Sequence, residues 1–391
     1  MITSSLNPLG ISWNVSIDNA PVALTDIQKV VIDYKENNHD IAFIEFIGVN
    51  SSVIGSYLDK PVIISLIING GAYQTFYGYI KNIEGNSTTH LGTVNFSPFQ
   101  TLRATCFGAS YVLRKKQNKV WNNVTLKDIV NDIAEYNRFS YNVPNDSFVF
   151  TRLMQSNKST WKFLVDIAKQ LNYAVSCHGT NIHVWNPLKA LGRQTTYTSL
   201  EGFDKTKKTY KPSPGTIIKF VPVIGNSTTE ETRTEVSAHV LDSSGTISTI
   251  NSEDIEYSAG FGQTLEKQYT NELALNLPSI ELAQRIAQAK KEFKGFTYHA
   301  VAEIVTDPNI IPGSIVKVQG YGLYFDGFWY VKTVRHELQS ESLISTLNLI
   351  KDSDSYEFTA FPNIEKYTKI ENTALINNVW VAQTESFNVY N

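Results

Sequence analysis

The chain has 391 residues, of which 42% are hydrophobic and 18% charged, so it is long enough for two or three domains with their own cores. Its net charge of −3 and the lack of a Lys/Arg block argue against sequence-specific binding of nucleic acid. Cys106 and Cys177 lie far apart and outside any CxxC motif, which excludes a disulfide framework and a cysteine-based zinc site. There is no secretory signal, and no apolar run nears the ~20 residues of a membrane span, so we expect a soluble protein made in the cytoplasm.

The first hundred residues have the pattern of an antiparallel β-domain. Aromatic residues make up 12% of the chain, which suits a β-sheet and also a surface covered by partner subunits. Runs rich in Val, Ile, Phe and Tyr predict four strands over 27–34, 41–49, 61–68 and 73–83. Turn-forming clusters separate these runs at 36–38, 50–52, 69–71 and 85–87.

The period of the apolar residues then changes from strand to helix. Thr125 has the position of an N-cap before apolar residues at helical spacing: Leu126, Ile129, Val130, Ile133 and Ala134. A second helix is predicted after Ser159, with an inward face of Trp161, Leu164, Ile167, Ala168 and Leu171. Ile182 to Trp185 closes this small α+β unit as a short strand.

The rest of the chain is more polar until strands resume. Residues 190–270 read as polar strands, with loops at 206–209 and 228–231. Pro278-Ser279 predicts the start of a third helix that ends at Gly295. Strands are predicted again from Thr297 to about Leu349, and beyond Asp352 only 379–381 resembles a strand.

An internal repeat connects the two β-rich regions. Residues 61–83 and 312–334 align without a gap at an offset of 251, with five identities: Pro61/Pro312, Ile64/Ile315, Gly71/Gly322, Tyr79/Tyr330 and Lys81/Lys332. Shared strand composition and duplication of a β-domain both explain such a match. Duplication would place the helical unit between two copies of one fold.

No arrangement of residues predicts catalysis. His336-Glu337 lacks the second histidine of a zincin motif, and Gly320-Tyr321-Gly322 lacks the third glycine of a dinucleotide fingerprint. Glu253, Asp254 and Glu256 read as a solvated loop, and the seven histidines are scattered. Trp121, Trp161 and Trp185 are predicted core residues of the helical unit. We therefore expect no enzyme, no cofactor and no metal.

Two stretches resemble the late control gene D family of phage tail hub proteins. The first is the helical unit, with Trp121 before Thr125-Leu126 and the Gln155-Ser156-Asn157-Lys158-Ser159 entry into the second helix. The second runs from Ile311-Pro312-Gly313 through Asp326-Gly327 to Leu349. The resemblance covers roughly residues 100–350 and consists of small apolar anchors rather than one invariant motif.

The resemblance implies a trimer in which each subunit carries two similar barrels. Such a hub, related to those of contractile phages and type VI secretion spikes, adapts a sixfold tail tube to a threefold spike. It implies as partners a tail tube or distal tail protein, a separate spike protein and other baseplate subunits, with DNA passing non-specifically through the lumen. We expect this chain to depart from the family in lacking a lysozyme-like insertion and a fused needle, so that the spike would be a separate polypeptide. The tail after Asp352, with Trp380 between Val379 and Val381, is a candidate contact for the spike or a neighbour, and a strand that closes the barrel is the alternative.

The expected fold class is α+β, mainly β, with two similar antiparallel barrels flanking a small α+β domain. The expected boundaries are a first barrel at 1–108, an insert at 109–190, a second barrel at 191–351 and an extension at 352–391. The expected function is that of a structural hub of a phage or phage-like tail baseplate, assembled in the bacterial cytoplasm and located in the virion tail. The alternatives are a glycan-binding adhesin and a peptidoglycan or capsule hydrolase.

Overall fold

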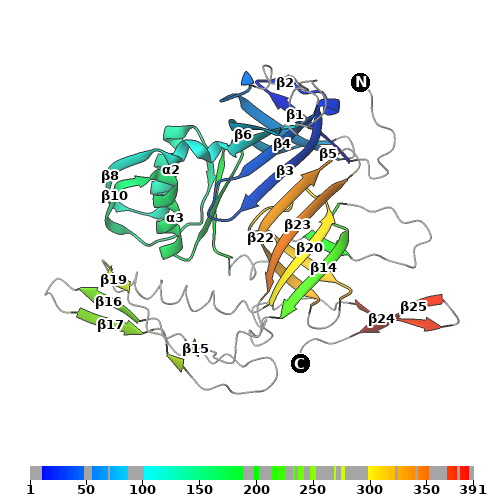
Figure 1. Cartoon of the computed structure of the whole chain (residues 1–391). Coiled ribbons are helices and arrows are strands. Elements are labelled where there is room, and N and C mark those ends of the chain that lie inside the picture. The colour runs from blue at the N-terminus through cyan, green and yellow to red at the C-terminus, as the bar shows by residue number, and fades with distance from the viewer. Residues whose placement is uncertain are drawn as a thin grey trace.

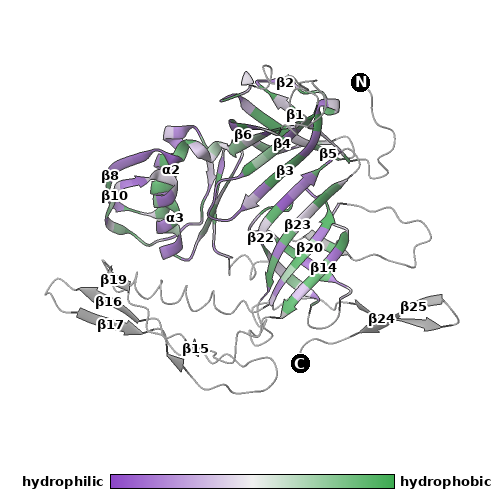
Figure 2. Ribbon diagram, in the orientation of Figure 1, coloured by the Kyte–Doolittle hydropathy of each residue, from purple (hydrophilic) through white to green (hydrophobic). Residues whose placement is uncertain are grey.

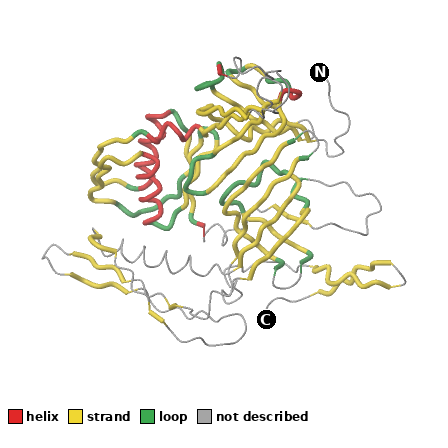
Figure 3. Tube along the Cα trace, viewed as in Figure 1, coloured by secondary structure: helices red, strands yellow, loops and turns green. Residues whose placement is uncertain are grey.

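The computed structural model shows a mainly β protein with a helical insert (Figures 1 and 3). It describes these residues: 11–47, 55–68, 71–86, 101–187, 198–201, 214–224, 232–233, 237–241, 247–251, 268–269, 274–277, 298–321, 325–339, 342–351, 368–376 and 379–386. The predicted third helix and the loops at 206–209 and 228–231 lie outside them. The expected fold class, two similar β-regions flanking a small α+β region, is confirmed. The expected domain boundaries stay predictions.

The first β-unit is a curled antiparallel sheet in the order β3-β4-β7-β6-β5-β1-β2. Alternating residues of its strands are buried, which is the pattern of a sheet with one face on a core. Its strands are β1 (Ile11–Ile17), β2 (Ala20–Pro21), β3 (Ile27–Lys35), β4 (Ile41–Ile47), β5 (Pro61–Ile68), β6 (Gly71–Asn86) and β7 (Thr101–Gly108), with a 3₁₀ turn η1 at Leu24–Asp26.

The sequence located four of these strands but misread one turn. Gly85 and Asn86 were expected to lie in a turn, yet they continue β6, because β7 pairs with them and supplies their backbone hydrogen bonds. Strands β1 and β7 were not predicted.

The insert contains the long helices of the described part of the chain, drawn in red in Figure 3. Helix α2 (Leu126–Asn137) begins at Thr125 with a full capping box to Asp128, and α3 (Thr160–Gln170) begins at Ser159, as predicted. All the residues predicted for the inward faces of the two helices are buried. The other elements of the insert are η2 (Ala109–Arg114), β8 (Lys116–Val124), β9 (Ser140–Asn142), β10 (Phe150–Ser159), β11 (Ala174–His178) and β12 (Asn181–Trp185).

The second β-unit repeats the strand order of the first. Its sheet runs β14-β20-β23-β22-β21-β13, and its strands follow one another along the chain as those of the first unit do. Thus β14, β20, β21, β22 and β23 correspond to β3, β4, β5, β6 and β7, although β13 runs parallel to β21 whereas β1 is antiparallel to β5. The strands are β13 (Thr198–Glu201), β14 (Ile217–Ile224), β20 (Tyr298–Val305), β21 (Ile315–Gln319), β22 (Gly327–Leu338) and β23 (Leu343–Lys351).

Two β-bulges occur at equivalent points of the two units. A bulge inserts an extra residue into one strand and fixes the local bend, so its position is a detailed marker of the backbone. The register shifts lie between Ile27 and Lys29 in β3, Ile217 and Lys219 in β14, Ile80 and Asn82 in β6, and Val331 and Thr333 in β22. The units are therefore copies of one backbone plan.

The gap-free repeat alignment is correct for its second strand and wrong for its first. Pro61 pairs with Tyr79 in the first unit, whereas Ile315 pairs with Tyr330 in the second. Tyr330 lies 251 positions after Tyr79, but Ile315 lies 254 positions after Pro61. Between these paired positions the second hairpin is three residues shorter than the first (254 − 251). Pro312 is therefore not the structural equivalent of Pro61.

Small separate sheets complete the described residues. The strands β15 (Thr232–Arg233) and β18 (Gln268–Tyr269) pair with each other, and β16 (Ser237–Leu241) pairs with β17 (Ile247–Asn251) and β19 (Ala274–Leu277). The hairpin of β24 (Thr368–Ile376) and β25 (Val379–Ser386) forms a sheet of its own.

Candidate functional site

The two β-units are joined edge to edge by the pairing of β22 with β3. Figure 1 shows the two groups of strands meeting along this line, which we call the internal seam. It is antiparallel and extends from the Thr333–Lys35 pair to the Leu338–Val30 pair. Because β22 also pairs with β23, and β3 with β4, the two units form one continuous sheet.

Charged side chains line the outer face of the internal seam. The Lys29 ammonium lies 2.7 Å from a Glu337 carboxylate oxygen. Arg335 Nε lies 3.2 Å from the other oxygen of Glu337 and 3.7 Å from Asp33 Oδ1. The Lys29 hydrogen bond is the main cause that lowers the pKa of Glu337. Opposite charges therefore face each other across β3 and β22, which favours this register.

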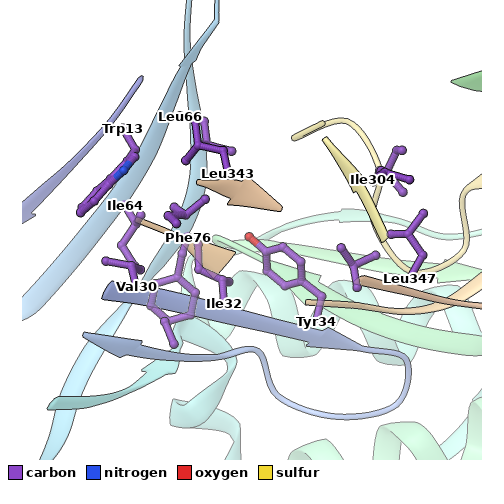
Figure 4. Close-up of a cluster of buried hydrophobic side chains, with 14 of the residues drawn as sticks. Trp13, Val30, Ile32, Tyr34, Ile64, Leu66, Phe76, Ile304, Leu343 and Leu347 are labelled. Carbon is purple, nitrogen blue, oxygen red and sulfur yellow. The ribbon is translucent and has the colours of Figure 1, made fainter. Parts of the chain in front are cut away.

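The inner face of the internal seam is covered by one core that both units share. A single cluster of buried side chains runs from Ile11 in β1 to Leu349 in β23. Trp13 Nε1 of the first unit donates to Gln339 O at 3.3 Å. Figure 4 shows side chains of the two units in this cluster, with Tyr34 of β3 lying between Phe76 and Leu347.

A buried polar cluster lies where the insert meets the internal seam. Asp40 is 2% exposed, and its Oδ2 lies 2.9 Å from His178 Nδ1 of β11. The Tyr34 ring contacts both His178 and His336 edge-on, at centroid distances of 5.0 and 5.5 Å. Burial raises the pKa of Asp40, while His178 opposes this rise. The cluster ties β3 to the insert on one side and to β22 on the other.

A second polar chain runs through the core of the second unit. His336 Nδ1 lies 2.6 Å from Ser345 Oγ, and the Ser345 hydroxyl donates to Thr306 Oγ1 at 3.0 Å. All three side chains are fully buried. Burial lowers the pKa of His336 to about 3, so this imidazole is neutral at pH 7. His336 is thus a core histidine whose Nδ1 is hydrogen-bonded and whose buried Nε2 has no hydrogen-bond partner, whereas its neighbour Glu337 binds Lys29 on the opposite face.

A hydrogen-bonded chain also joins the insert to both β-units. Trp185 Nε1 donates to the Tyr330 hydroxyl at 3.0 Å, and that hydroxyl donates to Glu36 Oε2 at 2.7 Å. Gly313, with φ +90°, lies against the Trp185 ring, where a Cβ would come within 2.5 Å of Cε2. Trp185 was predicted to anchor the core of the insert, but it anchors the junction between the insert and the second β-unit.

The other two tryptophans and both cysteines singled out in the sequence are buried core residues. Trp121 and Trp161 are buried in the core of the insert, and Trp121 stacks on Phe163 at 4.7 Å. Cys106 and Cys177 are free and buried. Burial raises the pKa of both thiols. The acidic group at 253–256 lies outside the described residues.

The structure brings together residues that the sequence did not connect. Asp40 and His178 are 138 positions apart, and Glu36 and Tyr330 are 294 apart, so no local motif marks either pair. Within the described ranges, no group of three His, Cys, Asp or Glu side chains gathers at metal-binding distance, and no helix is both long and apolar enough to cross a membrane.

The predicted contact residues Val379, Trp380 and Val381 lie in β25. Their backbone pairs with β24, where Leu375 is opposite Trp380. Among the described strands, β25 pairs with β24 alone, so the alternative that it closes a barrel is not seen. Their role in binding a spike or a neighbouring subunit stays a prediction.

Comparison with solved structures identifies the fold. The chain matches a tail protein from Neisseria meningitidis MC58 at a TM-score of 0.62 and 12% identity, covering 88% of this chain and 97% of that one. It matches the 43 kDa tail protein of prophage MuSo2 from Shewanella oneidensis at 0.60 and 10% identity, covering 87% and 98%. An E. coli component of the type VI secretion system matches at 0.54 and 12% identity, covering 88% and 78%.

Sequence comparison gives no such match. No protein-family pattern and no curated protein sequence matches this chain. At identities of 10–12%, the structural matches describe the backbone rather than the chemistry of any one member. The chain has the fold of phage tail proteins and of a type VI secretion component.

Proposed function

We propose that this protein is the structural hub of a phage or phage-like tail baseplate. The observation that carries the proposal is the duplication, because one chain presents two β-units with the same strand order and the same bulges. Three such chains provide six equivalent units. A trimer with this geometry adapts a sixfold tail tube to a threefold spike.

The fold shared with phage tail proteins supports this assignment. In the proposed assembly, the trimer binds the tube or distal tail protein on one side and a separate spike on the other. Other baseplate subunits surround it in the virion tail after assembly in the host cytoplasm, and DNA passes through its lumen without specific contacts. The proposed role is architectural and not catalytic.

Mass photometry of the purified chain, alone and with tube or spike proteins, tests the proposal. We expect a particle of three times the 43.9 kDa mass of one chain, formed alone or induced by those partners. A monomer that persists at micromolar concentration with tube and spike proteins present would contradict the proposed function.

The C-terminal hairpin is the proposed contact for the spike or a neighbouring subunit. Trp380→Ala tests this part separately. We expect the variant to remain a trimer and to bind the spike protein at least tenfold more weakly in a pull-down or surface-binding assay. Unchanged spike binding and unchanged trimer formation would exclude Trp380 as an anchor.

A further inference from the structure

We propose that copies of this chain join through the outer edges of β6 and β14, in a pairing that repeats the internal seam between neighbouring chains. The inference rests on the proposed hub and names its subunit contact. One copy would offer residues 83–86 of β6, and the next copy would offer residues 221–224 of β14. Each copy would use both edges, one toward each neighbour.

The internal seam is the template for this contact. Within the chain, β22 of the second unit pairs with β3 of the first. The duplication makes β6 the equivalent of β22 and β14 the equivalent of β3. Yet neither β6 after Ile80 nor β14 has a described strand on the corresponding side, since β6 continues along β7 and β14 pairs with β20 alone. Figure 1 shows β14 at the margin of its group of strands.

Equivalent residues at the internal seam and at the free edges differ in burial. Val31 of β3 is 4% exposed where β22 covers it, but its equivalent Val221 of β14 is 42% exposed. Val334 of β22 is 1% exposed, whereas its equivalent Ile83 of β6 is only partly buried against the core. Val223 is 53% exposed. Figure 2 shows hydrophobic residues along β14 and β20, which is unusual for a margin that faces water.

The register of the proposed contact follows from the duplication. The bulge positions relate β3 to β14 by 190 positions and β6 to β22 by 251. At the internal seam Arg335 is opposite Asp33. Transferring this pair places Glu84 of one copy opposite Val223 of the next. Pairs in the same ladder place Gly85 opposite Pro222 and Asn86 opposite Val221.

Pro222 lies in the middle of the β14 segment that the proposed contact uses. A proline lacks the backbone N–H and is confined to edge strands or bulges, so its presence marks β14 as an edge of the isolated chain. In the proposed ladder it removes at most one hydrogen bond, opposite Gly85. The missing donor weakens pairing at this edge in every register, which makes β14 a poorer template for unrelated strands before assembly.

The proposed contact is less charged than the internal seam. Val221 and Val223 of β14 stand where β3 has Val31 and Asp33, and Glu84 stands where β22 has Arg335. The Asp33–Arg335 attraction therefore has no counterpart between copies. Burial of valine side chains would drive the pairing, so we expect it to persist at high ionic strength.

This pairing is head-to-tail, since one copy contributes β6 and its neighbour contributes β14. A head-to-tail contact makes a ring if its rotation closes and a filament if it does not. Within each copy, the internal seam already relates one β-unit to the other by a rotation, and the proposed contact would repeat that rotation between copies. Equal steps within and between chains close the ring when three copies supply six units.

A designed disulfide tests the register. The variant Glu84→Cys/Val223→Cys places two thiols opposite each other only between copies, and the native cysteines are buried. After mild oxidation we expect covalent dimers and trimers on a non-reducing gel, with no species larger than a trimer. The control Glu84→Cys/Pro222→Cys puts the second thiol one residue away, on the opposite face of the strand, and should not cross-link.

A second variant separates the contact from the disulfide geometry. Val221→Asp places a charge at a position that is exposed in the isolated chain. The variant monomer, measured at a protein concentration too low for trimers to form, should therefore keep the melting temperature of the unmodified monomer. We expect its trimer to dissociate at protein concentrations at least tenfold higher than those of the unmodified chain. Trimers that neither cross-link at 84/223 nor weaken in Val221→Asp would overturn the proposed contact and leave the hub intact. Absence of any trimer with tube and spike proteins present would instead overturn the hub.

Discussion

The insert and the two β-units bury similar side chains but organise them differently. The insert has a core of its own, built from residues within 113–184 and organised around two capped helices. The β-units share one core and one sheet, joined by pairs more than 300 positions apart. The described chain therefore consists of an insert held together by contacts close in sequence, attached to a pair of β-units held together by contacts distant in sequence.

The largest expected effect comes from truncating the shared core. Trp329 is fully buried, and its Nε1 donates to Phe325 O at 2.8 Å. Trp329→Ala should lower the free energy of unfolding by about 3–5 kcal/mol. Because the core is shared, amide exchange should accelerate in β3 and β4 as well as in β20 and β23, as measured by hydrogen-exchange mass spectrometry. Loss of protection in the second unit alone would show that the units are independent.

The matched change in the insert is Leu164→Ala. Leu164 is fully buried on α3, so the variant should lose about 2–5 kcal/mol. Its exchange should accelerate within 113–184 while the large sheet keeps its protection. Equal acceleration in β20 or β23 would contradict the separation of the two cores.

Acid should weaken the β-units through His336. The folded protein holds the pKa of this imidazole at about 3, against 6.5 in an unfolded chain. Below pH 6.5 the unfolded state therefore binds a proton that the folded state does not, and stability falls with pH by about 1.4 kcal/mol per unit until pH nears 3. Tyr34 and Ser345 contact the ring, and His178 contributes charge that lowers its pKa further.

The variant His336→Gln isolates that contribution from those of the other groups. His39 and His183 also have pKa values lowered to about 4 by burial, and they remain in the variant. Denaturant unfolding at pH 7, 5.5 and 4.5 should show a shallower loss of stability in His336→Gln than in the unmodified chain. Identical slopes would mean that His336 takes up its proton at the same pH in the folded and the unfolded protein, so that its pKa is not lowered by folding.

The smallest expected effect comes from loosening the junction between the two regions. Tyr330→Phe removes the hydroxyl that links Trp185 to Glu36 and should cost about 1 kcal/mol. Burial already raises the pKa of Glu36 and the Tyr330 hydrogen bond opposes that rise, so the pKa should increase further in the variant. An NMR titration of the Glu36 carboxyl measures this change, and an unchanged pKa would exclude the hydrogen bond as a contributor.

The sequence predicted what local patterns determine. Thr125 and Ser159 mark the starts of both helices because capping is a short-range interaction, and the apolar spacing identified their buried faces. The second strand of the repeat was identified correctly because β6 and β22 share an offset along their whole paired length.

What the sequence could not predict depends on partners distant in the chain. The internal seam joins β3 to β22, and nothing in either strand specifies the other. The contact of Asp40 with His178 likewise arises only when the insert packs on β3. The first strand of the repeat was misaligned because a shorter hairpin keeps strand composition while it changes register.

The internal seam also imposes an order on folding. β3 emerges early in synthesis, but β22, the strand that pairs with it at the internal seam, is made about 300 residues later. Contacts between residues close in sequence form fast, and pairing of distant strands forms slowly. The insert should therefore reach its native packing before β3 pairs with β22. During that interval the nascent chain carries an open hydrophobic edge, which makes it a natural client of holding chaperones.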